Sequence, residues 1–249
     1  MALSIPLAAQ ADGCVVRSGE RTAALVELYT SEGCSSCPPA DRWLSTLGKR
    51  FGHERIVPLA LHVDYWDYLG WKDPYAQRQF SLRQRKLSQL QRMALVYTPQ
   101  VVLQGRDFPA WHGGAFEAAV AAINAQAPKA HITLQINALG NGQFDVAVHA
   151  EAFDAAQRSD AALYVAAFHN RLHSRITAGE NRGRAVEHDY VVLEWQGPFA
   201  LGAQGRVDER RKIPLLPNAA PADSGAAAFV QNRRTAEVLQ AVMLSACSG

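Results

Sequence analysis

The sequence predicts an α/β layer domain followed by an antiparallel, β-sandwich-like domain. In the first half, apolar runs typical of buried strands alternate with segments whose apolar residues repeat at helical spacing, which is the pattern of an α/β fold. In the second half, short alternating runs follow one another without helices between them, as in a β-sandwich. Because the composition changes near residues 127–129, we expect one domain at residues 12–127 and a β-rich domain at residues 128–249.

Three strands and three helices are expected in the first half. The strands at residues 23–29, 55–63 and 97–105 each contain an apolar run. Two helices, at 40–47 and 75–94, carry apolar residues on one face, and a third, at 114–125, is rich in alanine. The opposite face of the second helix is basic, and we expect it to face solvent; its residues are Arg78, Arg83, Arg85, Lys86 and Arg92.

The second half opens with a hairpin pattern. Residues 132–136 and 144–148 alternate apolar with polar side chains, and the Gly-Asn-Gly sequence at 140–142 between them favours a tight turn. Further strands are expected at 162–169, 186–194, 211–216, 227–231 and 238–244.

Composition and charge exclude several classes of protein. Hydrophobic residues make up 48% of the 249 residues, which excludes wholesale disorder. A formal net charge of +2 does not indicate a nucleic-acid partner. No apolar run reaches the ~20 residues of a membrane-spanning helix, and P-loop, dinucleotide and serine-hydrolase fingerprints are absent.

The N-terminus and the cysteines indicate an oxidising compartment. Residues 1–11 are apolar and small and end in Ala9-Gln10-Ala11, a small-x-small pattern typical of signal-peptide cleavage, so we expect a signal-peptide remnant and a periplasmic or secreted protein. The four cysteines are Cys14, Cys34, Cys37 and Cys247, an even count that fits such a compartment.

The segment from Glu32 to Pro39 is the strongest functional signal. It places Cys34 and Cys37 two residues apart between an expected strand and an expected helix. Helix N-termini supply unpaired N–H groups and a positive dipole end, both of which favour a thiolate and lower a cysteine pKa from about 8.5 to roughly 3.5–7.5. We expect this junction to expose the Cys34 sulfur and to place Cys37 where it resolves a mixed disulfide.

The other two cysteines lie near the chain ends. Four cysteines allow three pairings, and sequence alone does not choose among them. Because chain termini often lie close together, we expect a structural Cys14–Cys247 disulfide, with two unpaired thiols as the alternative.

Metal binding is the rival interpretation of the cysteine pair. Two thiolates suit Cu(I) or zinc, but zinc usually takes four ligands and the chain has no second CxxC pair. His169 and His173 are four residues apart but lie at an expected strand end. We expect no metal and no cofactor beyond the cysteine disulfide itself.

The aromatic loop at residues 64–74 has two interpretations. Its tryptophans, Trp66 and Trp71, are expected either to line a peptide groove or to pack the sheet onto the long helix.

Three motifs carry a family resemblance. Residues 26–41, 62–74 and 97–100 resemble a family of secreted bacterial thioredoxin-like proteins catalogued as a domain of unknown function. The resemblance covers residues 25 to about 125, and is weaker at 169–171 and 179–181. It implies a thioredoxin-like fold in which Thr98 and a cis Pro99 face the cysteines and bind an incoming peptide substrate. The usual Trp before the first cysteine and Gly-Pro between the two are absent.

The expected function is therefore exported thiol–disulfide exchange with protein or peptide thiols and a redox partner protein. Cys34 attacks and Cys37 releases the product, with Glu32 or Asp41 relaying a proton. The alternative is a non-catalytic thiolate module that binds Cu(I) or a partner protein.

Overall fold

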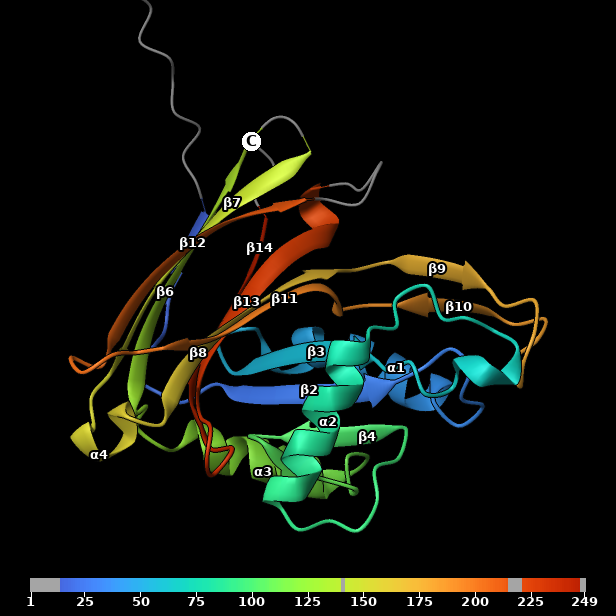
Figure 1. Ribbon diagram of the computed structural model, residues 1–249, viewed down its shortest axis with the longest axis horizontal. Helices are drawn as coiled ribbons and strands as arrows, with labels where there is room; N and C mark the ends of the chain where they lie inside the picture. The colour runs from blue at the N-terminus through green and yellow to red at the C-terminus, as the bar shows by residue number, and fades with distance from the viewer. Residues whose placement is uncertain (1–13, 140–141, 215–220, 247–249) are drawn as a thin grey trace, which may run out of the picture.

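The apolar runs of the first half form the centre of an eight-stranded mixed sheet. The computed structural model describes residues 14–139, 142–214 and 221–246. The sheet has the order β14-β13-β8-β11-β3-β2-β4-β5 (Figure 1). Its strands are β2 (Ala24–Thr30), β3 (Ile56–His62), β4 (Gln100–Leu103), β5 (Arg106–Asp107), β8 (Ala161–His169), β11 (Val191–Ala200), β13 (Ser224–Asn232) and β14 (Val238–Ser245).

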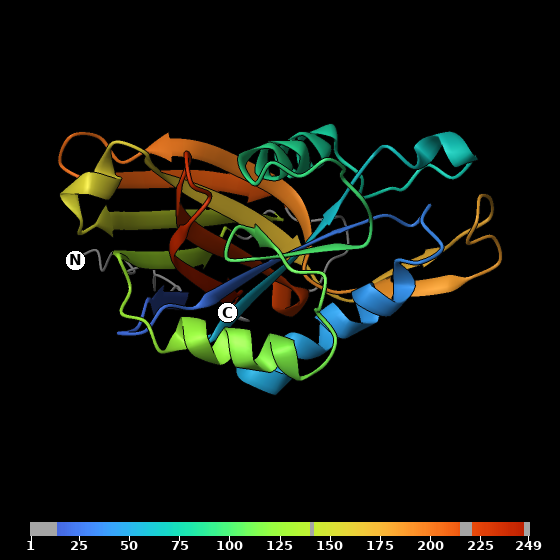
Figure 2. The same cartoon turned by 90° about the horizontal axis from the view of Figure 1, so that it is seen from below.

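Helices cover both faces of the central strands. Every residue of β2 and β3 is buried, as their near-continuous apolar runs predict for parallel strands. Helices α1 (Pro38–Phe51) and α3 (Gly114–Asn124) lie on one side of these strands, and α2 (Arg78–Leu90) lies on the other (Figure 2). All six elements expected in the first half are present, with shifted ends.

A second sheet packs against strands β8, β13 and β14 of the first sheet. It is antiparallel with the order β1-β6-β7-β12, formed by β1 (Cys14–Arg17), β6 (Ala130–Ala138), β7 (Gln143–Ala152) and β12 (Arg206–Pro214). Strand β8 contributes side chains to two separate cores, one on each face of the large sheet. Tyr164 and Phe168 face the core under the helices, whereas Leu163 and Val165 face the core between the sheets, since side chains alternate across a strand.

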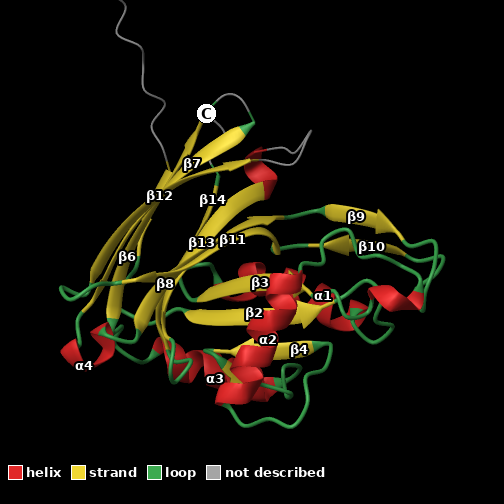
Figure 3. Cartoon of the chain, viewed as in Figure 1, coloured by secondary structure: helices red, strands yellow, loops and turns green. Residues whose placement is uncertain are grey.

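The large sheet contains strands from both sides of residues 127 and 128 in the chain. Strand β11 lies beside β3 in parallel, with Val191 opposite Ala60, and β8, β13 and β14 extend the same sheet. Strands from the second half therefore bury apolar surface against the first half. Strands dominate the structure, and the longer helices lie around β2, β3 and β4 (Figure 3). The short helical segments are α4 (Ala155–Arg158) and the 3₁₀ turns η1 (Asp67–Leu69) and η2 (Pro221–Asp223).

The strand expected at residues 186–194 is wrong. The chain instead forms β10 (Ala185–His188), which pairs with β9 (Leu172–Arg175) in a projecting hairpin, and then the separate strand β11. Tyr190 between them has φ +58°, a left-handed conformation that ends β10 and redirects the chain.

The prediction that the basic face of α2 is solvated is wrong at Arg83. Its side chain is 10% exposed and bonds to Glu27 on β2, which is fully buried. An apolar strand that contains a carboxylate needs such a partner.

Two predictions fall outside the described residues. The signal-peptide remnant at 1–11 is one, and the Cys14–Cys247 disulfide is the other, because residues 247–249 are not described. Among the described residues, no helix has the length and apolar character needed to cross a membrane.

The β4–β5 turn packs too closely on a neighbouring turn to accept a side chain at Gly105. Gln104 and Gly105 both have positive φ, as in a two-residue hairpin turn. A Cβ atom at Gly105 would lie 1.9 Å from the Ala236 carbonyl oxygen, a backbone atom of the β13–β14 turn. Gly105→Ala should therefore lower the free energy of unfolding in urea by about 2–3 kcal/mol.

Gly202→Ala is the matched control. Its φ is +66°, but the nearest atom to an added Cβ is 4.0 Å away, so only the conformational cost of about 1 kcal/mol applies. Equal losses in the two variants would contradict the close approach at Gly105.

Candidate functional site

The cysteine turn, residues 31–37, connects β2 to α1. Cys34 and Cys37 form a disulfide with their Cα atoms 5.5 Å apart. The Cys34 and Cys37 N–H groups donate to the carbonyl oxygens of Ser31 (3.1 Å) and Cys34 (3.2 Å). Pro38 and Pro39 occupy the first turn of α1, where the missing N–H leaves no helical bond unmade. The turn thus fixes both cysteines at the helix N-terminus, as predicted.

Both cysteines are buried, so the prediction that the junction exposes the Cys34 sulfur is wrong. Cys34 is 1% exposed and Cys37 is 0% exposed, whereas the serines between them face solvent. Trp66 packs closely on this turn, where a Cβ at Gly33 would lie 3.0 Å from the Trp66 Cβ. A loop of the second half also closes on the turn, since the Asn181 side chain donates to the carbonyl oxygens of Glu32 and Cys34.

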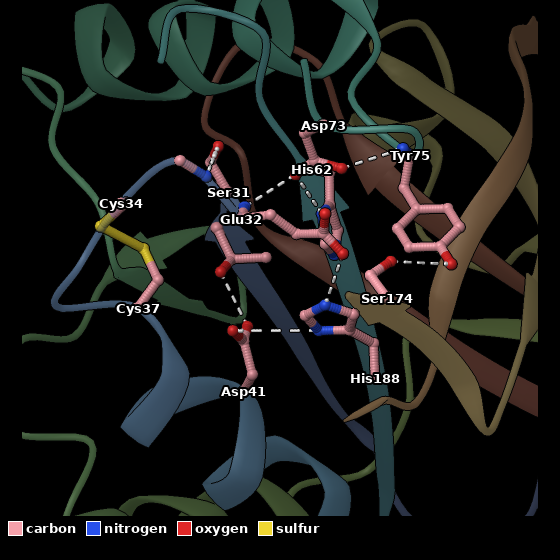
Figure 4. Close-up of polar contacts among 12 residues, drawn as sticks. Ser31, Glu32, Cys34, Cys37, Asp41, His62, Asp73, Tyr75, Ser174 and His188 are labelled. Carbon is pink, nitrogen blue, oxygen red and sulfur yellow. Dashed lines mark hydrogen bonds and ion pairs between the residues drawn. A yellow bond between two sulfur atoms is a disulfide. The ribbon is translucent and has the colours of Figure 1, made fainter. Parts of the chain in front are cut away.

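Five buried ionisable side chains lie beside the turn (Figure 4). They come from separate elements and are Glu32, Asp41, His62, Asp73 and His188, all at most 7% exposed. Charged groups are rarely buried unless they are paired. A cluster of this kind next to the disulfide marks a candidate functional site.

His62 at the end of β3 forms an ion pair with Asp73. The His62 Nδ1 lies 2.7 Å from an Asp73 carboxylate oxygen. Burial by itself would lower the pKa of His62, but Asp73 outweighs it and raises the pKa above its ordinary value. Burial would likewise raise the pKa of Asp73, but His62 and donated N–H bonds from Glu32 and Tyr75 hold that pKa low. Each partner therefore favours the charged form of the other.

His188 on β10 lies between two carboxylates. Its Nε2 is 3.1 Å from Glu32 Oε1 and its Nδ1 is 3.9 Å from Asp41 Oδ2. Burial raises the pKa of Asp41, in spite of the opposing effect of His188, and the Thr30 hydroxyl donates to its other oxygen at 2.7 Å. Asp41 and His188 also line a cavity of about 400 Å³ between α1 and β10. This side of the site is suited to holding and moving protons.

The structure brings the other predicted site residues to this region. The Trp66 indole N–H donates to the Thr98 hydroxyl at 2.7 Å, and the Thr98–Pro99 peptide bond is cis. The Trp71 indole N–H donates to Glu32 Oε2 at 2.7 Å. Trp66 thus connects the cysteine turn to Thr98, and both half-buried tryptophans use their N–H groups inside the protein. Their roles in binding substrate stay predictions.

Sequence reasoning missed His62, Asp73, His188 and Asn181 as site residues. The segments around them were noted, but no local pattern distinguishes a buried histidine from an exposed one. One available signal was the histidine that ends an apolar strand at residue 62. Among the described residues, no group of three or more His, Cys, Asp or Glu side chains is arranged to hold a metal ion.

Comparison with known families decides where the chain belongs. The model of a family described as "Protein of unknown function (DUF1223)" matches residues 25–231. The chain is a DUF1223 protein. The prediction of a family of unknown function is thereby confirmed, and the DUF1223 match extends over both halves of the large sheet.

Solved structures share the fold of this DUF1223 chain. Protein AGR_C_4864 from Agrobacterium tumefaciens is 26% identical, with a TM-score of 0.63 over 91% of this chain and 95% of that one. HBP35 of Porphyromonas gingivalis is 14% identical, with a TM-score of 0.68 over 92% of this chain and 76% of that one, a likeness of fold alone. No curated protein matches the chain.

Proposed function

We propose that this protein is an exported thiol–disulfide oxidoreductase that acts on protein or peptide thiols. The observation that carries the proposal is the Cys34–Cys37 disulfide at the start of α1, beside buried groups able to exchange protons. A strand–turn–helix junction with a CxxC pair at the helix N-terminus is the arrangement found in thioredoxin-like domains. We therefore assign residues 12–127 to that class by analogy, and a periplasmic or secreted location follows from the signal-like residues 1–11.

In the reducing direction, the Cys34 thiolate attacks a substrate disulfide. One substrate sulfur leaves as a thiolate, and a Cys34–substrate disulfide forms. The Cys37 thiol then loses its proton and attacks the Cys34 sulfur, so the Cys34–Cys37 bond forms and the second substrate thiolate leaves. Counted from the dithiol form, the protein gives up two electrons and two protons, which convert the substrate disulfide into two thiols. Oxidation of a substrate dithiol is the same sequence reversed.

Asp41 is the proposed acceptor of the Cys37 proton. It follows Cys37 by one helical turn, and its N–H donates to the Cys37 carbonyl at 3.1 Å. A carboxylate with a raised pKa accepts a proton more readily at neutral pH than an ordinary one. His188 then connects Asp41 to Glu32.

Cysteine variants test the proposed function. Cys34→Ser and Cys37→Ser should each lower insulin reduction and dithiol oxidation at least about a hundredfold, because each removes one of the two reacting sulfurs. Cys37→Ser should also accumulate a mixed disulfide through Cys34, visible by mass spectrometry of the intact protein.

Ser36→Ala is the matched control. Its hydroxyl lies 3.3 Å from the Cys34 sulfur but takes no part in the covalent steps, so it should retain activity. Absence of activity in both directions for a wild-type protein with reactive thiols would remove the oxidoreductase proposal. In that case a stoichiometric Cu(I) complex that Cys34→Ser abolishes would favour a binding module.

A further inference from the structure

A loop from the second half of the chain closes on the cysteine turn. The hairpin loop, residues 176–184, connects β9 to β10. The hairpin projects from the rest of the structure, and its strand β10 lies beside α1 (Figure 1). Its base is held by two backbone bonds between Ile176 and the pair Gly183 and Arg184. At its tip, Gly179 has φ +71° and packs against Trp71, with 3.3 Å between an added Cβ and the Trp71 Cβ. The hairpin loop is therefore an ordered structure seated against the site.

Asn181 makes the central contact between this loop and the cysteine turn. Its side-chain amide nitrogen donates to the carbonyl oxygens of Glu32 at 2.8 Å and Cys34 at 2.9 Å. Asn181 is only 1% exposed, so both bonds are shielded from water. Next to it, the Glu180 carboxylate accepts from the Ser35 N–H at 3.0 Å. Three polar groups on the turn backbone are thus held from the second half of the chain.

The position calls for an amide side chain. Two carbonyl oxygens face one side chain, so that side chain must provide two donors on a single atom, as an asparagine NH₂ does. An aspartate at residue 181 would place acceptor oxygens against carbonyl oxygens, and an alanine would leave both carbonyls without their partner. Either change removes buried hydrogen bonds that hold the loop closed.

We propose that Asn181 is a positioning residue that keeps the Cys34 sulfur shielded, and that release of its two hydrogen bonds admits the incoming sulfur. Disulfide exchange requires direct access of one sulfur to another, and Cys34 is 1% exposed with the loop closed. The second half of the chain thereby controls when the thiol reacts. The inference rests on the proposed function only in taking Cys34 as the attacking thiol.

The test measures the rate at which iodoacetamide alkylates Cys34 in the reduced protein between pH 5 and 9. Peptide mass spectrometry assigns the label to Cys34. Asn181→Ala and Asn181→Asp should raise the limiting rate at high pH about tenfold. In Asn181→Ala the pH midpoint should change little, because access changes more than thiol acidity. Arg182→Ala is the matched control, since Arg182 is an exposed neighbour in the same loop. Limiting rates in both Asn181 variants equal to that of the wild type would overturn the proposal.

Hydrogen exchange separates release of the loop from global unfolding. In the variants, amides of residues 177–184 should lose protection while those of β2 keep it. The wild type provides a test that needs no variant. In the wild type, the folded structure should slow two reactions relative to the unfolded chain: alkylation of Cys34 and hydrogen exchange of the Gly183 amide, which bonds to Ile176. The two slowing factors should agree within about threefold if the same opening of the loop permits both reactions. Unequal factors would contradict gating by this loop.

Turnover measured on the same proteins distinguishes the two proposals. If neither the wild type nor the Asn181 variants exchange disulfides, the oxidoreductase proposal is rejected. A tenfold faster alkylation of Cys34 in those variants than in the wild type would still support the role of Asn181. An active wild type whose Asn181 variants alkylate at the wild-type rate would reject the role of Asn181 alone.

Discussion

Replacing Arg83 with methionine should lower the free energy of unfolding by about 3–5 kcal/mol, because it leaves a buried carboxylate without its partner. The Arg83 Nε and Nη2 atoms donate to the two Glu27 carboxylate oxygens at 2.5 and 3.0 Å, and Glu27 is fully buried in the middle of β2. Burial by itself would lower the pKa of Arg83, but Glu27 outweighs it and holds the pKa above its ordinary value. The Arg83 guanidinium is therefore charged in the folded protein.

Arg83 also joins the two halves of the chain. Its guanidinium lies over the rings of Tyr164, Trp195 and Phe229 at 5.1, 4.7 and 5.3 Å from their centroids. These rings belong to β8, β11 and β13, so one side chain on α2 contacts three strands of the second half. Methionine retains some of this packing but neither the charge nor the donors, which makes the loss chiefly electrostatic.

Urea unfolding of three variants tests the pair. Arg85→Met, on an exposed position of the same helix, should change the free energy of unfolding by no more than about 0.5 kcal/mol. The double variant Glu27→Leu with Arg83→Met should recover about 2 kcal/mol or more relative to Arg83→Met alone, since no buried charge is then left unpaired. If Arg83→Met were no more harmful than Arg85→Met, Glu27 would not depend on this partner.

The elements of the first half were predictable because their signals are local. The apolar runs of β2 and β3 and the helical spacing in α1 lie within short segments. Likewise, the position of Cys34 and Cys37 between strand and helix follows from the order of those segments. One more local signal lies in β2, because Glu27 within an apolar strand requires a buried partner.

Pairing between distant strands left no comparable signal. Nothing in residues 191–200 specifies that β11 lies beside β3 and carries the second half into the first sheet. His188 was assigned to the middle of one strand, and its place between Glu32 and Asp41 depends on the turn after β10. For the same reason the contact of Asn181 with the cysteine turn has no local signal, since Asn181 and Cys34 are 147 residues apart in the chain.

Removal of the Asp73 carboxylate should be about as costly as loss of Arg83. Asp73→Ala leaves a buried His62 without its counter-charge and the Glu32 and Tyr75 N–H groups without an acceptor, so a loss of about 3–5 kcal/mol is expected. Asp73→Asn keeps an acceptor oxygen and the shape of the side chain, and should lose about 1–3 kcal/mol. The His149–Asp208 pair is the matched control: it has a similar distance of 2.8 Å, but Asp208 is 81% exposed. Asp208→Asn should therefore cost no more than about 1 kcal/mol.

The pH dependence of stability identifies the charge pair itself. The pKa of His62 is raised in the folded protein, so its contribution is complete below the unfolded value of about 6.5 and is lost as the pH rises through the higher folded pKa. The pKa of Asp73 is lowered, so its contribution is present above about 3.9 and is lost as the pH falls through the lower folded pKa. Urea unfolding between pH 5 and 9 should show the wild-type free energy declining above about pH 6.5, on the side set by His62. Asp73→Asn should flatten this decline, because the carboxylate that favours a charged His62 is then absent while burial still disfavours that charge. A decline of equal slope in Asp73→Asn would mean that another group titrates, and the His62–Asp73 pair would not be its source.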